Sequence, residues 1–159
     1  MSRPRSGFSL IELLIVIAIM GIIVTFGLPR FGDARRTYNV RSARDNAAAY
    51  LATARAAAIR RGQPARFVVE GDAIDVHVRN AAGNFEPLTM RDGRSVSRRD
   101  LDVQFGVSIE PSGATIIEYD PRGFAMLGGT QRFTFIHNDR SDVVCVSGLG
   151  IIMRNGCVL

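Results

Sequence analysis

The first third of the chain carries an uninterrupted apolar run, which predicts a helix long enough to cross a membrane. Between residues 8 and 28 every side chain is apolar or small except Ser9, Glu12 and Thr25. As a helix this run is about 31 Å long, which matches the hydrocarbon thickness of a bilayer. A secretory signal would have a shorter core followed by a small-x-small cleavage site, and Pro29 and Arg30 separate this core from such a site. We therefore expect a retained membrane span over residues 8–28.

The next segment, residues 29–61, predicts an amphipathic continuation of the same helix. It is rich in alanine, the strongest helix former. One side is polar and carries Arg41, Arg44, Asp45 and Arg55. Gly62 and Pro64 are a helix stop signal. The apolar positions recur at helical spacing and should face a sheet: Val40, Ala43, Ala47, Tyr50, Leu51, Ala54 and Ala58.

Residues 62–159 change to a period of two, which predicts an antiparallel β domain. Short runs of β-branched and aromatic residues alternate with turn signals, and no gap has room for a crossover helix. The expected fold class is α+β, with a long N-terminal helix packed on an antiparallel sheet or sandwich. We expect strands at 65–70, 74–79, 85–89, 103–109, 114–119, 132–137, 142–147 and 151–154.

Composition and charge change this picture little. At 159 residues, the chain has room for one membrane helix and one small domain. The formal net charge is +5, and loss of Arg3 and Arg5 with a leader would leave +3, which is modest for a nucleic-acid-binding protein.

Glu12 is the unusual residue of the apolar run. An ionised carboxylate one helical turn inside such a segment costs about 2 to 3 kcal/mol and commonly marks a function with a charged partner. The alternative is that Glu12 sits at the membrane interface, where its side chain reaches water and the helix N-terminus stabilises it.

The surroundings of Glu12 favour the functional interpretation. A short basic leader with Arg3 and Arg5 ends at Gly7, Phe8 follows, and Glu12 comes four residues later. This constellation resembles the class III signal of type IV pilins and pseudopilins. The resemblance implies that a prepilin peptidase cuts between Gly7 and Phe8 and that the new amino group of Phe8 is methylated. It also implies that Glu12 is an assembly residue, pairing with the Phe8 amine of a neighbouring subunit.

The same resemblance gives expectations for the rest of the helix and for location. Gly21 and Pro29 fall where many members of the family carry a helix-weakening glycine and a kinking proline. The chain is expected to be a single-pass protein of the inner membrane, with a cytoplasmic N-terminus before processing and a periplasmic C-terminal domain. Residues 1–7 would be the leader. The expected partners are the prepilin peptidase, other pilins or pseudopilins through the N-terminal helix, and membrane lipid.

The β region resembles one particular group within this family. A strand ending at Tyr119, the turn Asp120 to Gly123, and a terminal hairpin around Gly148 and Gly150 resemble the GspH/FimT group. That group contains minor pseudopilins of type II secretion systems and minor pilins of type IV pili. The implied function is a structural filament subunit, at or near the tip, that supports protein export; the alternative is a minor pilin in pilus biogenesis or DNA uptake. As local chemistry, the segment from Asp120 to Gly123 predicts a tight turn.

Cys145 and Cys157 are the two cysteines. In an exported domain they are expected to form a disulfide, which requires the last residues to fold back. The alternative is a buried thiol at Cys145 and a frayed end at Cys157.

Direct DNA binding is the rival hypothesis to a purely structural role. Arg91, Arg94, Arg98 and Arg99 form a basic segment that also holds Asp92 and Asp100. A phosphate site needs such a cluster, but the segment lacks an interleaved aromatic residue to stack on bases. A solvated arginine loop is the favoured interpretation.

We expect no enzyme activity, no cofactor and no metal. His77 and His137 stand alone on separate strands, without a catalytic or metal-binding motif around them. Two acidic pairs, Asp72 with Asp75 and Asp100 with Asp102, lack the oxygen-rich loop of a calcium site and are expected to be solvated turns. A cleft that gathered either histidine with carboxylates would revive the hypothesis of a membrane-tethered enzyme.

Overall fold

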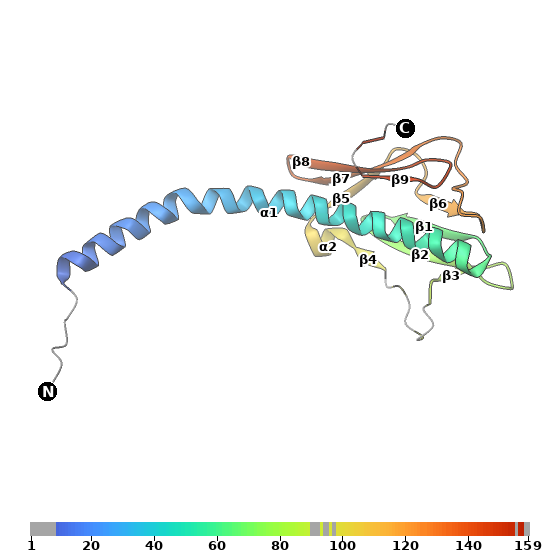
Figure 1. Cartoon of the computed structure of the whole chain (residues 1–159), viewed down its shortest axis with the longest axis horizontal. Helices are drawn as coiled ribbons and strands as arrows, with labels where there is room; N and C mark the ends of the chain where they lie inside the picture. The colour runs from blue at the N-terminus through green and yellow to red at the C-terminus, as the bar shows by residue number, and fades with distance from the viewer. Residues whose placement is uncertain (1–8, 90–92, 94–95, 97, 155, 158–159) are drawn as a thin grey trace. The chain divides into compact units, whose positions relative to one another are not determined.

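A computed structural model describes residues 9–89, 93, 96, 98–154, 156 and 157, with the backbone alone at 26–31. The chain divides into two compact units, residues 1–36 and 37–159, and each is described by itself. Helix α1, Leu10–Arg61, contributes to both units (Figure 1). The long helix predicted from the hydrophobic pattern is therefore present, and it ends where Gly62 takes a left-handed conformation with φ 63°.

The first unit is the N-terminal half of α1, whose apolar side chains are exposed. Leu10 is 78% exposed and Val16 is 42% exposed. Within the described residues, no helix is long and apolar enough to cross a membrane. The span expected at 8–28 includes Phe8 and the side chains at 26–28, which lie outside the described residues. Helix α1 runs through Gly21 and Pro29 without interruption. The bend expected at these two residues stays a prediction.

In the second unit, α1 lies along a β domain and buries the face that the sequence predicted (Figure 1). Small side chains dominate this face. Tyr50, also expected on this face, is only partly buried. The other predicted positions are each at most 2% exposed: Val40, Ala43, Ala47, Leu51, Ala54 and Ala58.

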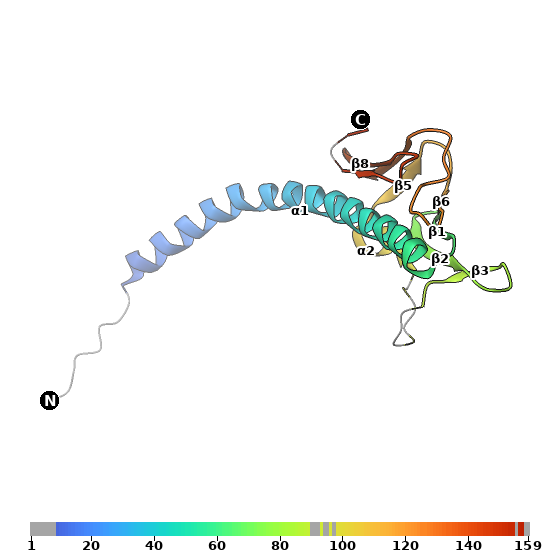
Figure 2. The same cartoon turned by 45° about the vertical axis from the view of Figure 1, so that its right-hand side comes forward.

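The β domain consists of two antiparallel sheets (Figure 2). The first has the order β3 (Phe85–Pro87), β2 (Ala73–Arg79), β1 (Ala65–Glu70) and β6 (Ile116–Tyr119), with β4 (Arg99–Asp100) also on β2. The second has the order β5 (Ser108–Pro111), β7 (Gln131–His137), β8 (Arg140–Val146) and β9 (Ile152–Met153).

Aromatic side chains join the two sheets in one core with α1. Phe67 of β1 and Phe133 of β7 meet edge to face, with ring centroids 5.6 Å apart. Both rings belong to the same buried cluster as Leu51 of α1. The predicted α+β class, with a long helix packed on antiparallel strands, is confirmed.

The prediction of a strand at residues 103–109 is wrong in its first half. Residues Leu101–Phe105 form a short helix, α2, and β5 begins only at Ser108. The Asp100 side chain caps α2 by accepting a hydrogen bond from the Val103 amide at 3.0 Å. Gly106, with φ 66°, closes its other end. These local hydrogen bonds outweigh the alternating pattern of the sequence, and they leave Val103 84% exposed.

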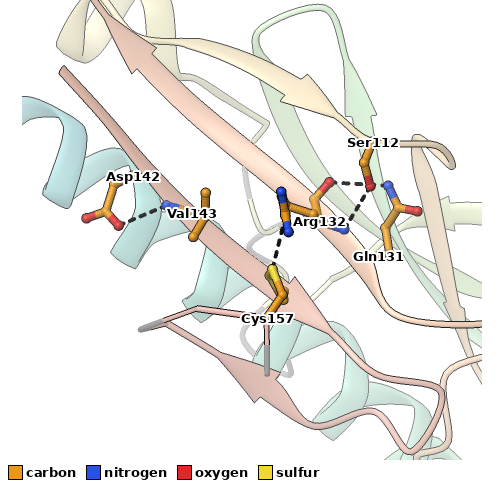
Figure 3. Close-up of a disulfide and its surroundings, with 7 residues drawn as sticks. Ser112, Gln131, Arg132, Asp142, Val143 and Cys157 are labelled. Atoms are coloured by element: carbon orange, nitrogen blue, oxygen red, sulfur yellow. Dashed lines mark hydrogen bonds between the residues drawn. A yellow bond between two sulfur atoms is a disulfide. The ribbon is translucent and has the colours of Figure 1, made fainter. Parts of the chain in front are cut away.

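The C-terminal residues fold back onto the second sheet. Strand β9 pairs antiparallel with the end of β8, where Cys145 lies opposite Met153. Cys145 and Cys157 form a disulfide in the structure, with Cα atoms 5.4 Å apart. The Arg132 Nε donates to Cys157 Sγ at 3.2 Å (Figure 3). The oxidised state of this pair in the cell stays a prediction.

The correction at α2 can be tested with a matched pair of substitutions. Leu101→Ala should lower the free energy of unfolding by about 2 to 5 kcal/mol, because Leu101 is fully buried. Val103→Ala should change it by less than about 0.5 kcal/mol, because this side chain is exposed. Denaturant unfolding of the full chain in detergent, followed by circular dichroism, measures both. A strand would turn both residues to the core, so similar losses in the two variants would contradict the helix.

The disulfide can be tested by peptide mapping of the exported chain under non-reducing conditions. We expect one linked peptide containing Cys145 and Cys157. Because the bond closes a loop with a sequence separation of 12, its reduction should lower the stability of the domain by about 3 kcal/mol. Two alkylatable thiols in the exported protein would show that the bond does not form.

Candidate assembly residues

The start of α1 places Glu12 in the first helical turn. The Leu13 amide donates to Ser9 O at 3.2 Å, and the Glu12 amide donates to Ser9 Oγ at 3.4 Å. Ser9 is therefore an N-cap, and the Ser-x-x-Glu spacing matches a capping box. The helix dipole favours a carboxylate at this position. The Ser-x-x-Glu spacing at residues 9–12 is the sequence signal that predicts this cap.

Glu12 is exposed in the structure of the single chain. Gly7 and Phe8, the two residues of the expected cleavage site, lie outside the described residues. The described helix begins at Leu10. The expected pairing of Glu12 with the Phe8 amine of a neighbouring subunit stays a prediction.

The basic residues proposed for DNA contact are only partly described. Arg91 and Arg94 lie outside the described residues. Arg98 Nη1 lies 2.6 Å from Glu70 Oε2, and Arg99 Nη1 donates to Asn46 Oδ1 at 2.9 Å. The two described arginines are therefore engaged by side chains of the domain itself.

The histidines lie apart from each other on different sheets. His77 Nε2 of β2 is 3.1 Å from Asp75 Oδ2, while the His137 Nδ1 of β7 contacts the Gly106 carbonyl oxygen. Among the described residues, no three histidine, cysteine, aspartate or glutamate side chains are placed to hold a metal ion.

Two of the acidic residues expected to be solvated are structural instead. Asp100 caps α2, as described above. Asp72, in the turn between β1 and β2, accepts the Ile109 amide on Oδ1 at 2.8 Å and the Leu101 amide on its carbonyl oxygen at 2.9 Å. Asp72 therefore fastens α2 and β5 to the first sheet.

The turn after β6 has the predicted chemistry. Asp120 Oδ1 accepts the amides of Arg122 and Phe124, each at 2.9 Å, and Oδ2 lies 3.1 Å from Arg122 Nε. Gly123 supplies the positive φ, 86°. Desolvation, the largest single influence, acts to raise the pKa of Asp120, but these hydrogen bonds and the Arg122 charge together lower the pKa below its usual value.

This turn is a junction between α1 and both sheets. Arg55 Nε of α1 donates to Gly123 O at 2.9 Å. A Cβ atom at Gly123 would lie 2.7 Å from Ile59 Cδ1, and one at Gly150 would overlap Gly123 O. The helix end and the connection between β8 and β9 thus close tightly around the turn.

Tyr119 lies beneath this junction and is fully buried. Its hydroxyl has no hydrogen-bond partner within the described part of the chain. Burial raises the pKa of Tyr119, although the nearby Arg55 charge opposes the shift. The phenol therefore stays protonated at physiological pH and contributes to packing.

Family models match both the N-terminal segment and the β domain of the chain. Residues 43–150 match the family described as type II transport protein GspH, and residues 2–28 match the prokaryotic N-terminal methylation motif. No curated protein matches the chain at a significant level.

Solved structures show the same fold at low sequence identity. The type IV minor pilin FimU of Pseudomonas aeruginosa is 15% identical with a TM-score of 0.56, covering 74% of this chain and 88% of FimU. The minor pseudopilin EpsH of the Vibrio cholerae type 2 secretion system is 10% identical with a TM-score of 0.58, covering 73% of this chain and 95% of EpsH. Because the GspH family model matches residues 43–150, which include most of the β domain, the chain belongs to the GspH family of minor pseudopilins and minor pilins.

Proposed function

We propose that this chain is a structural subunit of a type II secretion pseudopilus, anchored in the inner membrane and assembled at or near the filament tip. A prepilin peptidase removes residues 1–7, and the Phe8 amine is methylated. The β domain lies in the periplasm. The match of residues 2–28 to the N-terminal methylation motif is the observation that carries this proposal.

The exposed apolar half of α1 supports a role in assembly. From Leu10 to Val24 the large aliphatic side chains are between 42% and 78% exposed in the single chain. Exposure of such a continuous apolar surface to water is energetically unfavourable. Lipid or the helices of neighbouring subunits therefore have to cover this surface. Both environments are available to a subunit that passes from the membrane into a filament.

Glu12 supplies the recognition chemistry in this proposal. After leader removal, the Phe8 amine is positive and the Glu12 carboxylate is negative, and either charge is costly when unpaired at membrane depth. Pairing of Glu12 with the Phe8 amine of a neighbour removes both costs and sets the axial position of the new subunit. The Ser9 cap supports this arrangement because it fixes the turn that carries Glu12.

A type IV pilus role is the second candidate function. The description of the matched family, a type II transport protein, favours secretion. The structural likeness to FimU, a type IV minor pilin, favours the second candidate. Direct DNA binding receives less support, because Glu70 and Asn46 already engage Arg98 and Arg99.

Gly7→Ala should block leader removal, because the added methyl group alters the residue at the scissile bond. Immunoblotting of cells that coexpress the chain and a prepilin peptidase should show only the longer precursor, with wild-type chain as the processed control. Normal conversion of the variant to the mature length would contradict the assigned cleavage position.

Glu12→Gln should leave processing intact and lower incorporation into filaments at least about tenfold, because the Phe8 amine of the neighbour loses its counter-charge. Glutamine keeps the capping-box geometry, so the variant isolates the charge. The measurement is the amount of processed chain in sheared, purified filaments.

Ser9→Ala is the matched control, because it removes the cap and keeps the Glu12 charge. It should reduce incorporation much less than Glu12→Gln does. Equal losses in the two variants would assign Glu12 to helix capping rather than to charge pairing between subunits.

A further inference from the structure

The two sulfur atoms of the disulfide have different surroundings. Cys145 is 0% exposed, whereas Cys157 is only partly buried. Cys145 lies on β8, which is paired with β7 on one side and with β9 on the other. Cys157 belongs to the segment that follows β9, residues 154–157, which we call the tail. A reagent in solution therefore reaches Cys157 more easily than Cys145.

The second sheet explains the burial of Cys145. Its partners in the antiparallel register are Arg132 of β7 and Met153 of β9. Side chains at paired positions lie on the same face of a sheet, so Cys145 is flanked by both. Its neighbours Val144 and Val146 belong to the core cluster, so Cys145 points to the opposite, outer face. The disulfide holds the tail against this outer face.

Contacts other than the disulfide also hold the tail. Arg154 Nη1 lies 3.8 Å from Asp45 Oδ1 of α1, and Arg44 Nη1 donates to the Arg154 carbonyl oxygen at 3.4 Å. The strand β9, which precedes the tail, is paired with β8. None of these contacts needs the bond between the sulfur atoms. We therefore expect the tail of the reduced chain to keep its place, with Cys157 as the outer of the two thiols.

Arg132 supplies a positive charge at the outer sulfur. Its Nε donates to Cys157 Sγ at 3.2 Å (Figure 3). Its backbone is fixed, because the Arg132 amide donates to Ser112 Oγ at 3.2 Å and the Arg132 carbonyl oxygen accepts the Ser112 amide at 2.8 Å. The thiolate, not the thiol, is the reactive form of cysteine, and a neighbouring guanidinium favours the thiolate. Arg132 is thus placed to activate Cys157.

We propose that Cys157 is the site at which an external disulfide reacts with the reduced chain, with Arg132 as the positioning residue that stabilises its thiolate and Cys145 as the second thiol. The inference goes beyond the proposed function and does not depend on filament assembly. It rests on the unequal burial of the two cysteines and on the contact between Arg132 and Cys157.

The reaction has two exchange steps. First, the Cys157 thiolate attacks one sulfur of the external disulfide, so that a mixed disulfide forms and the other external sulfur leaves as a thiolate. Second, the Cys145 thiolate attacks Cys157 Sγ, so that the internal disulfide forms and the remaining external sulfur leaves. Two electrons pass from the cysteines to the external disulfide, and the two cysteine protons end on the two external thiols.

Single-cysteine variants of the full-length chain in detergent test the order of the two sulfurs. The probe is glutathione disulfide, and intact mass after acid quenching measures the mixed disulfide. The Cys145→Ser chain, which keeps Cys157, should form the adduct at least about tenfold faster than the Cys157→Ser chain, which keeps Cys145. In the reduced wild-type chain, peptide mapping of the quenched reaction should find the adduct on Cys157.

Equal rates in the two single-cysteine variants would overturn the inference, whether they come from an open tail or from an unfolded chain. An adduct trapped on Cys145 of the wild-type chain would also overturn it, because the outer thiol would then not be the first to react.

Substitution of Arg132 in the Cys145→Ser chain tests the charge. Arg132→Gln should lower the rate of adduct formation at pH 7 about threefold, because a tenfold loss of thiolate is partly offset by greater nucleophilicity. Arg132→Lys should keep most of the rate. Arg140→Gln is the matched control, because Arg140 belongs to the same sheet and lies 3.7 Å from Asp139. An unchanged rate in Arg132→Gln, or equal losses in all three variants, would overturn the inference.

Discussion

Burial of one alanine-rich face of α1 is the constraint on which the second unit, residues 37–159, depends. Ala43, Ala47, Ala54 and Ala58 are fully buried. Leu51 fills the space between them and joins the cluster that also holds Phe67 and Phe133. A single helix face therefore shares one buried cluster with strands of both sheets.

The second half of α1 also organises the surface of the domain. Arg55 reaches the turn after β6, and Ile59 packs against Gly123. At its other end, Asn39 donates to the Phe105 carbonyl of α2 at 2.9 Å. Polar contacts at the two ends of the buried face thus position the irregular segments at the turn after β6 and at α2.

The sequence predicted the helix, most strands and the buried helix face, because these follow from hydrophobic period and from strong stop signals at Gly62 and Pro64. It missed α2, since Asp100 and Gly106 supply caps whose local hydrogen bonds outweigh an alternating pattern. It also missed the tight packing around Gly123. Contacts between Ile59, Gly123 and Gly150 depend on tertiary packing that no local pattern encodes. Glu12 stood out because a carboxylate in an apolar run is rare.

In the proposed function, the apolar segment is retained after cleavage and the mature chain begins at Phe8. Intact mass of the membrane-extracted chain, expressed with and without a prepilin peptidase, tests it most directly. We predict that the peptidase causes a loss equal to residues 1–7, accompanied by the mass of one added methyl group. An unchanged mass, or cleavage beyond residue 28, would contradict the proposed function, because the mature chain would then keep residues 1–7 or lack the helix that carries Glu12.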